Sequence, residues 1–306
     1  MGKHSIFIRV LAAALSVILL LTALPANVVF ALDDNGEDAI QVSSWDDLYE
    51  ACQNAPDNVS TTIVLSDNVT RPSNSDNDRI EINNKKVIIL DLNDKTLHAN
   101  RTDAGKYYHV LDVHEGGNLT IQDSGFSGTI KGGYANNGGG IYISEGAVCT
   151  INGGTISNNY AKDKGGGVYT EGTLIMTQGT ISRNCTSSED GGRIYCAKSG
   201  TIQLKNVFFR ENEANEYGSG IMIVLGNDDS YIRNCYFEKN GFNYFAARGG
   251  GICVDADIVD RTLNITDSLF DNNWGTSLRR RDLSEKRYDP NDRRQDHKQR
   301  SYGSRR

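Results

Sequence analysis

GGGIYI at residues 138–143 recurs with small changes as GGGVYT at 165–170, GGRIYC at 191–196, GSGIMI at 218–223 and GGGICV at 249–254. The first residues of successive phrases are 27, 26, 27 and 31 residues apart. A fixed period of this length indicates stacked structural units, each of which buries its apolar side against its neighbours. The phrase therefore predicts a solenoid.

A second phrase, a large apolar residue followed three positions later by asparagine, interleaves with the first. It occurs at Leu97/Asn100, Ile156/Asn159, Ile181/Asn184, Phe209/Asn212, Phe237/Asn240 and Phe270/Asn273. After Ile130, Gly133 takes the place of asparagine, and Gly125-Phe126-Ser127 stands before it as an insertion that breaks the spacing. Two phrases in constant phase predict about seven coils.

The repeated units are strands rather than helices. Apolar residues alternate in short runs such as 90–92 and 141–143, and Gly and Asn dominate the turns between them. These segments lack the 3.6-residue periodicity of an amphipathic helix. Three short strands per turn, stacked in parallel on the turns above and below, account for the period. We therefore predict an all-β fold, a right-handed single-stranded parallel β-helix, with a short N-terminal capping helix.

The constant residues have a physical role at the corners of the coils. Glycine permits positive φ and a close approach of neighbouring coils. Asparagine tolerates the left-handed region and can bond the same amide one coil above and below, which predicts a ladder. The ladder residues are Asn159, Asn184, Asn212, Asn240 and Asn273. Inside them, Ile141, Val168, Ile194, Ile221 and Ile252 are expected to stack in the core.

The first 31 residues have the pattern of an export signal. Lys3 and Arg9 precede an apolar run at 10–24, and Val29 and Ala31 supply the small residues of a cleavage site. The run is shorter than the roughly 20 residues of a membrane span, so a retained anchor is the alternative. We expect a mature chain without a membrane span, secreted or at the cell surface.

Residues 32–60 form a predicted N-terminal segment that contains the capping helix. Ser44 is its expected N-cap, and Trp45, Leu48 and Cys52 share one helical face. Pro56 ends the helix. The β-helix is expected to occupy 61–274, with its first strand at 61–65.

The segment 275–306 is predicted to be a basic, disordered tail. Its part from 279 to 306 has 11 Lys+Arg, 5 Asp+Glu and few apolar residues. The abrupt change leaves two alternatives, a genuine tail or the product of a truncated or frame-shifted gene. Between 32 and 278 the chain has 19 basic and 34 acidic residues, about −15, which argues against nucleic-acid binding by the folded body.

Six cysteines occur without a CxxC pair or a Cys/His cluster, so the sequence does not predict a zinc site. Six cysteines allow fifteen complete pairings, and the disulfide state stays open. We expect most of them to be small buried residues. His109 and His114 have no matching partner in the sequence and are interpreted as structural.

The alternation of Gly-Gly-x-aliphatic with Phe-x-x-Asn resembles the repeats of polymorphic outer-membrane proteins and autotransporter adhesins, on a pectin-lyase-like β-helix. VIILDLNDKTLHAN at 87–100 is similar to the opening coil of many exported bacterial β-helix proteins. The resemblance covers about 40–274 and implies a secreted or surface-exposed bacterial passenger, often adhesive. No LPxTG sorting motif occurs in the sequence, so the mode of anchoring stays open.

Catalysis has weak candidates. Asp255, Asp257 and Asp260 form the densest carboxylate group, and the first two share a face by period two. They are candidates for an acid/base pair or for a calcium site, and a solvated loop is the alternative. Motifs typical of polygalacturonases are absent. A polysaccharide lyase or glycoside hydrolase that acts on acidic polysaccharide is therefore the second hypothesis.

Binding is the first hypothesis. Tyr142, Tyr169 and Tyr195 occupy one place in three successive coils, so an outward aromatic stripe is expected if Ile141 and Ile143 point inward. Such a stripe suits sugar rings or a protein surface, and the alternative is that it only stabilises the stack. The sequence thus predicts a non-catalytic structural or adhesive module. Its expected partner is an extracellular polysaccharide or a host or cell-surface protein, with no cofactor unless calcium binds.

Overall fold

A computed structural model describes residues 29–32, 38–73, 75, 78–100, 108–187, 193–213, 218–241, 249–255 and 261–274. Most of the predicted signal segment and the whole basic tail lie outside these residues. Strand β1 (Val29–Leu32), which pairs antiparallel with β2, contains the predicted cleavage site. In the described part of the chain, no helix is long and apolar enough to span a membrane.

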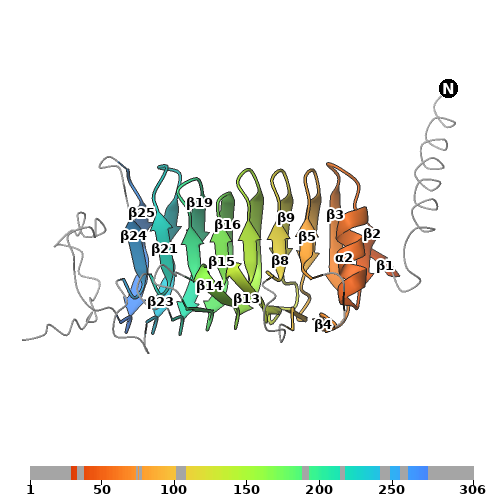
Figure 1. Cartoon of the computed structure of the whole chain (residues 1–306), viewed down its shortest axis with the longest axis horizontal. Helices are drawn as coiled ribbons and strands as arrows, with labels where there is room; N and C mark the ends of the chain where they lie inside the picture. The colour runs from red at the N-terminus through yellow and green to blue at the C-terminus, as the bar shows by residue number, and fades with distance from the viewer. Residues whose placement is uncertain are drawn as a thin grey trace, which may run out of the picture.

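The described strands form three sheets, and the largest of them runs the length of an elongated rod (Figure 1). The first row of the largest sheet contains β1, β2 (Asp38–Val42), β3 (Ser60–Leu65), β6 (Val87–Asp91), β9 (Asn118–Gln122), β13 (Val148–Ser157), β16 (Thr173–Ser182), β19 (Thr201–Lys205), β22 (Tyr231–Arg233) and β25 (Asn264–Thr266). Its second row contains β4 (Val69–Thr70), β7 (Thr96–His98), β10 (Thr129–Lys131), the ends of β13 and β16, β20 (Val207–Arg210), β23 (Tyr236–Glu238) and β26 (Leu269–Asp271).

A seven-stranded sheet contains β5 (Ile80–Ile82), β8 (Leu111–Val113), β12 (Ile141–Ile143), β15 (Val168–Thr170), β18 (Ile194–Cys196), β21 (Ile221–Val224) and β24 (Ile252–Asp255). A three-stranded sheet contains β11 (Tyr134–Asn137), β14 (Tyr160–Lys164) and β17 (Cys185–Thr186). From β2 onward the paired strands are parallel. The seven stacked strands correspond to about six full turns, so the predicted parallel β-solenoid is confirmed.

The core fills the inside of the coils with one apolar residue above another. Ile141, Val168, Ile194 and Ile221 are paired in register and fully buried, as the glycine phrases predict. On the opposite wall, Phe209, Phe237 and Phe270 stack with ring centroids 4.6 and 4.7 Å apart. Successive coils therefore repeat both the backbone and the core packing.

The glycines of the phrases occupy two kinds of position. The first glycine has positive φ, +61° at Gly138 and +65° at Gly165, where an L-residue would be strained. The second is required for close approach, since a Cβ on Gly139 would lie 2.3 Å from the carbonyl oxygen of Tyr160 in the next coil. The phrase is therefore a corner at which two coils touch through their backbones.

The ladder asparagines stack inside the coils, close to the glycine phrases, and bond from coil to coil. The Nδ2 group of Asn212 donates to the Ile181 carbonyl and to Asn240 Oδ1, both at 2.9 Å, and its Oδ1 accepts the amide N–H of Asn184. Asn159, Asn184, Asn240 and Asn273 repeat this arrangement. The ladder thus satisfies buried backbone groups that the corner leaves without strand partners.

The expectation that the ladder asparagines adopt the left-handed region was wrong. The left-handed residue precedes the asparagine: Asn158, Arg183, Glu211, Lys239 and Asn272 have φ between +50° and +54°. The preceding residue makes the corner and directs its side chain outward, so Arg, Glu and Lys are tolerated there. Asn100 is different, because it has φ +49° itself and its amide donates to the Arg71 carbonyl.

Helix α2 (Trp45–Asn54) covers the N-terminal side of the first coils, as predicted. Ser44 is its N-cap, and the Ser44 hydroxyl accepts the Asp47 amide at 3.1 Å. Trp45, Leu48 and Cys52 are buried. The structure adds strand β2 before the helix, so the largest sheet begins earlier than residue 61.

All six cysteines lie in the described part of the chain, and none forms a disulfide there. Five are buried, and Cys185 is half-buried. Burial raises the pKa of the Cys52, Cys149 and Cys196 thiols to about 12. These thiols are therefore protonated at neutral pH and act as small apolar side chains.

Candidate functional site

The outer face of the seven-stranded sheet brings together one side chain from each coil. In register order these are Glu81, Asp112, Tyr142, Tyr169, Tyr195, Met222 and Cys253. The three tyrosine rings are stacked, with centroids 5.2 and 5.5 Å apart. The structure therefore places the predicted tyrosines side by side on the face opposite the core.

The tyrosine stripe is largely covered. Tyr169 is 8% exposed and Tyr195 is 6% exposed, whereas Tyr142 is half-buried. The hydroxyls of Tyr142 and Tyr169 both donate to Glu171, at 2.9 and 3.0 Å. Burial, together with Glu171, raises the pKa of both hydroxyls. The Lys164 ammonium lies 4.8 Å from the centre of the Tyr195 ring. These partners favour a stabilising role, and a ligand role for the stripe stays a prediction.

The same face has a charged cluster that the sequence did not reveal. The Arg79 guanidinium lies 2.8 Å from both Glu81 Oε1 and Asp112 Oδ2. His114 Nε2 lies 3.7 and 3.8 Å from the same two oxygens. Glu81 and Asp112 each stand between two core residues, as Tyr142 does, and this shared alternation is the signal that could have located them.

Histidine 109 lies beside this cluster. Its ring packs on Tyr142 with centroids 4.9 Å apart, and its Nδ1 lies 2.8 Å from the Gly138 carbonyl oxygen. Burial lowers its pKa despite the nearby Asp112 carboxylate. A neutral imidazole wedged between coils suits the structural interpretation made from the sequence.

Glu81, Asp112 and His114 have ligand atoms within 4.8 Å of one another and could hold a metal ion. Arg79 already contacts both carboxylates and offsets one of their two negative charges, so an ion would have to compete with it. The predicted calcium candidates lie elsewhere: Asp255 is half-buried at the end of β24, and Asp257 and Asp260 are outside the described residues. Calcium at that position stays a prediction.

A second surface lies on the outer side of β20, β23 and β26. Phe208, Tyr236 and Leu269 are in register there and form what we call the apolar strip. Phe208 is 52% exposed and Leu269 is 51% exposed. The Tyr236 ring meets Phe208 edge-on at 6.0 Å. In the preceding coils Thr129, Thr155 and Thr180 occupy the same column. Sequence reasoning missed this strip, although each member directly precedes a core aromatic residue.

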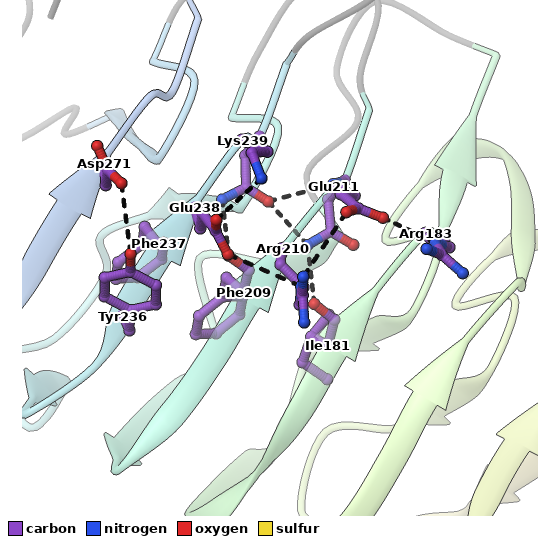
Figure 2. A network of polar contacts seen from close by, with 12 residues as sticks. Ile181, Arg183, Phe209, Arg210, Glu211, Tyr236, Phe237, Glu238, Lys239 and Asp271 are labelled. Atoms are coloured by element: carbon purple, nitrogen blue, oxygen red, sulfur yellow. Dashed lines mark hydrogen bonds and ion pairs between the residues drawn. The ribbon is translucent and has the colours of Figure 1, made fainter.

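Paired charges border the apolar strip (Figure 2). Glu211 bonds Arg183 at 2.8 Å and lies 3.8 Å from Arg210. Glu238 contacts Arg210 at 3.8 Å and Lys239 at 3.1 Å. The hydrogen bond from Arg183 lowers the pKa of Glu211. Because acidic and basic residues alternate from coil to coil, the border has polar groups but little net charge.

The fold agrees with the comparison to known families. The profile of the right-handed β-helix region matches residues 108–280. The chain therefore belongs to the right-handed β-helix family. No curated protein and no solved structure is significantly similar to it.

Proposed function

We propose that this chain is a non-catalytic binding module of an exported surface protein and that it binds an uncharged polysaccharide along the apolar strip. The observation that carries the proposal is the exposure of Phe208 and Leu269, with the half-buried Tyr236 between them, on adjacent parallel strands. In the seven-stranded sheet, Tyr169 and Tyr195 have the same periodicity but are covered.

A polysaccharide suits this surface because both are linear and repeat at short intervals. Strands about 4.8 Å apart present one side chain per coil to successive sugar rings. Apolar and aromatic side chains supply contact area for the flat faces of sugars, and the bordering Arg210 and Glu238 offer hydrogen bonds to hydroxyls. The compensated border and the acidic body favour an uncharged polymer over an acidic one.

The proposal is tested by affinity electrophoresis of the full chain through gels that contain galactomannan, xylan or polygalacturonate. We expect an uncharged polymer to retard the chain. The double variant Phe208→Ala/Tyr236→Ala should bind at least tenfold more weakly. Phe208 is exposed and Tyr236 is half-buried on the outer face of the sheet, so their loss leaves the core intact. Tyr169→Phe is the matched control on the covered stripe and should bind as the wild type does.

Two outcomes would contradict the proposal. If none of the gels retards the chain, the proposal that it binds a polysaccharide is rejected. Loss of binding in Tyr169→Phe, with full binding by Phe208→Ala/Tyr236→Ala, would move the ligand to the seven-stranded sheet. Export is part of the proposal and is tested separately, by mass spectrometry of the N-terminus of the mature chain, with cleavage expected after Ala31.

One observation favours a second function, hydrolysis or elimination on an acidic polysaccharide. Glu81, Asp112 and His114 converge beside Arg79, and carboxylates with an imidazole can act as acid and base toward a uronate that an arginine binds. New reducing ends or unsaturated uronate products from polygalacturonate, lost in Asp112→Asn, would establish it. Wild-type protein that yields neither product would exclude it for this substrate.

A further inference from the structure

Phe126 combines two features that folding does not explain. Its side chain is 91% exposed, more than any other large apolar residue of the described chain. Its φ is +79°, a conformation that is strained for a bulky L-residue and easy for glycine. Neither the exposure nor the strain stabilises the solenoid, and backbone strain of this kind concentrates at functional positions.

The turn that displays Phe126 is held rigidly by three aspartates. Asp123 Oδ2 accepts the Gly128 amide at 2.6 Å, and Asp94 Oδ1 accepts the Ser127 amide at 2.7 Å and its hydroxyl at 2.8 Å. Asp91 Oδ1 accepts the Ser124 amide at 3.0 Å. The turn at 123–128 is therefore fastened at both ends to the coil that precedes it.

The insertion also fits its place closely. A Cβ on Gly125 would lie 2.1 Å from Asp94 Cγ, so the turn rests directly on the coil below. Phe126 N–H donates to the Asp123 carbonyl at 3.4 Å, which closes the turn under the exposed ring. A ring presented on a turn that is already held by hydrogen bonds costs little further ordering of the backbone when it binds.

We propose that Phe126 is an anchor residue that inserts into an apolar pocket of a protein partner whose rim is cationic. The ring is 91% exposed on its turn, so the partner must supply the pocket that covers it, and apolar pockets of this size are features of proteins. Asp91, Asp94 and Asp123 place three carboxyl groups at the base of the turn, which favours lysines or arginines at the rim. This site is independent of the apolar strip.

The test replaces Phe126 with the photo-crosslinking residue p-benzoylphenylalanine in the full chain, made by the cells that produce it. The matched control carries the same residue at position 208, which is also an exposed phenylalanine but lies on a flat strand. We expect one protein to crosslink from position 126 and not from 208. The captured protein is then purified, and its affinity is measured against the wild type and Phe126→Ala.

We expect Phe126→Ala to weaken this affinity at least thirtyfold, and added salt to weaken the wild-type complex. Unchanged affinity, or no crosslink specific to position 126, would overturn the proposal. Equal partition of the wild type and Phe126→Ala between buffer and phosphatidylcholine vesicles is expected, and wild-type insertion would indicate a lipid surface instead.

A second measurement needs no partner. Phe126→Gly relieves the positive φ without removing a buried contact, so we expect its thermal unfolding midpoint to equal or exceed that of the wild type. A lower midpoint would mean that the ring stabilises the fold, and the anchor role would then be rejected.

Discussion

The two ends of the described solenoid are built differently. At the N-terminal end, α2 buries Trp45, Leu48 and Cys52 over the first coils. In the last described coil, Phe270 is 40% exposed, although its counterpart Phe237 one coil earlier is fully buried. Ile252, Val254 and Ile265 are likewise less buried than the residues with which they pair.

This difference shows where a solenoid obtains its stability. Each coil gains most of its burial from the coils on either side, so a residue with the same chemistry is worth less in an end coil than inside the stack. A helix that takes the place of the missing coil restores the burial of such a residue, and with it the residue's full contribution to stability. Local opening is therefore expected to begin at the last described coil and not under α2.

Trp45→Ala should have the largest effect. Removal of this fully buried ring opens a cavity between α2 and the coils, and we expect a loss of about 3–5 kcal/mol in the free energy of unfolding. Phe270→Ala should cost about 1 kcal/mol, because the ring is already partly in water. Urea denaturation of both variants measures the difference, and equal losses would refute the contrast between the ends.

The ladder gives the next largest effect. Asn212→Ala leaves the buried Ile181 carbonyl and Asn184 amide without their side-chain partners, and we expect a loss of about 2–3 kcal/mol. Asn273→Ala, at the end of the ladder, should cost roughly half as much. The two unfolding free energies are compared under one set of conditions. A larger loss for Asn273 would show that the last coil is as well supported as the middle.

The N-cap of α2 is worth less. Ser44→Ala removes the acceptor of the Asp47 amide and should lower stability by about 1 kcal/mol. Ser44→Asp keeps an acceptor and serves as the control, with stability close to that of the wild type. Thermal unfolding of both variants is sufficient. If Ser44→Ala unfolds at the same temperature as the wild type, the N-cap does not contribute to the stability of the N-terminal end.

Acid should lower the stability of the N-terminal half by a still smaller amount, and so reduce its advantage over the C-terminal end. Burial lowers the pKa of both His98 and His109, which lie in the N-terminal half. Below the unfolded pKa of about 6.5, the unfolded chain binds protons that the folded chain does not, so stability falls as the pH falls through this range. His109→Gln should reduce the difference in stability between pH 7.5 and 5.5. A wild-type protein that is more stable at pH 5.5 would contradict the sign.

The sequence predicted the features that recur once per coil. Gly138 and Asn212 show in the sequence because backbone contact and buried hydrogen bonds demand the same residue type in most of the later coils. Helix α2 was predicted from local signals instead, since its cap residue Ser44 and its apolar face are read from adjacent residues.

Features that depend on contacts between coils could not be predicted in this way. The cover over Tyr169 and Tyr195 comes in part from Glu171 and Lys164, and the Lys164 contact reaches across 31 residues. Arg79 meets Asp112 in coils that have no glycine phrase, so no repeated pattern aligned them. The strain at Phe126 depends on hydrogen bonds from the coil below and has no signature in composition.

The ladder and the strand pairs have one orientation in common, since their hydrogen bonds run along the rod rather than across it. Tension applied to the two ends of the rod would load these bonds one coil at a time, so the coils would separate one after another. Each coil of 26–31 residues would lengthen from about 5 Å to roughly 90–110 Å as it came free. A molecule of this kind yields under a pull in small, repeated steps, so a surface attached through it would be released gradually rather than by a single rupture.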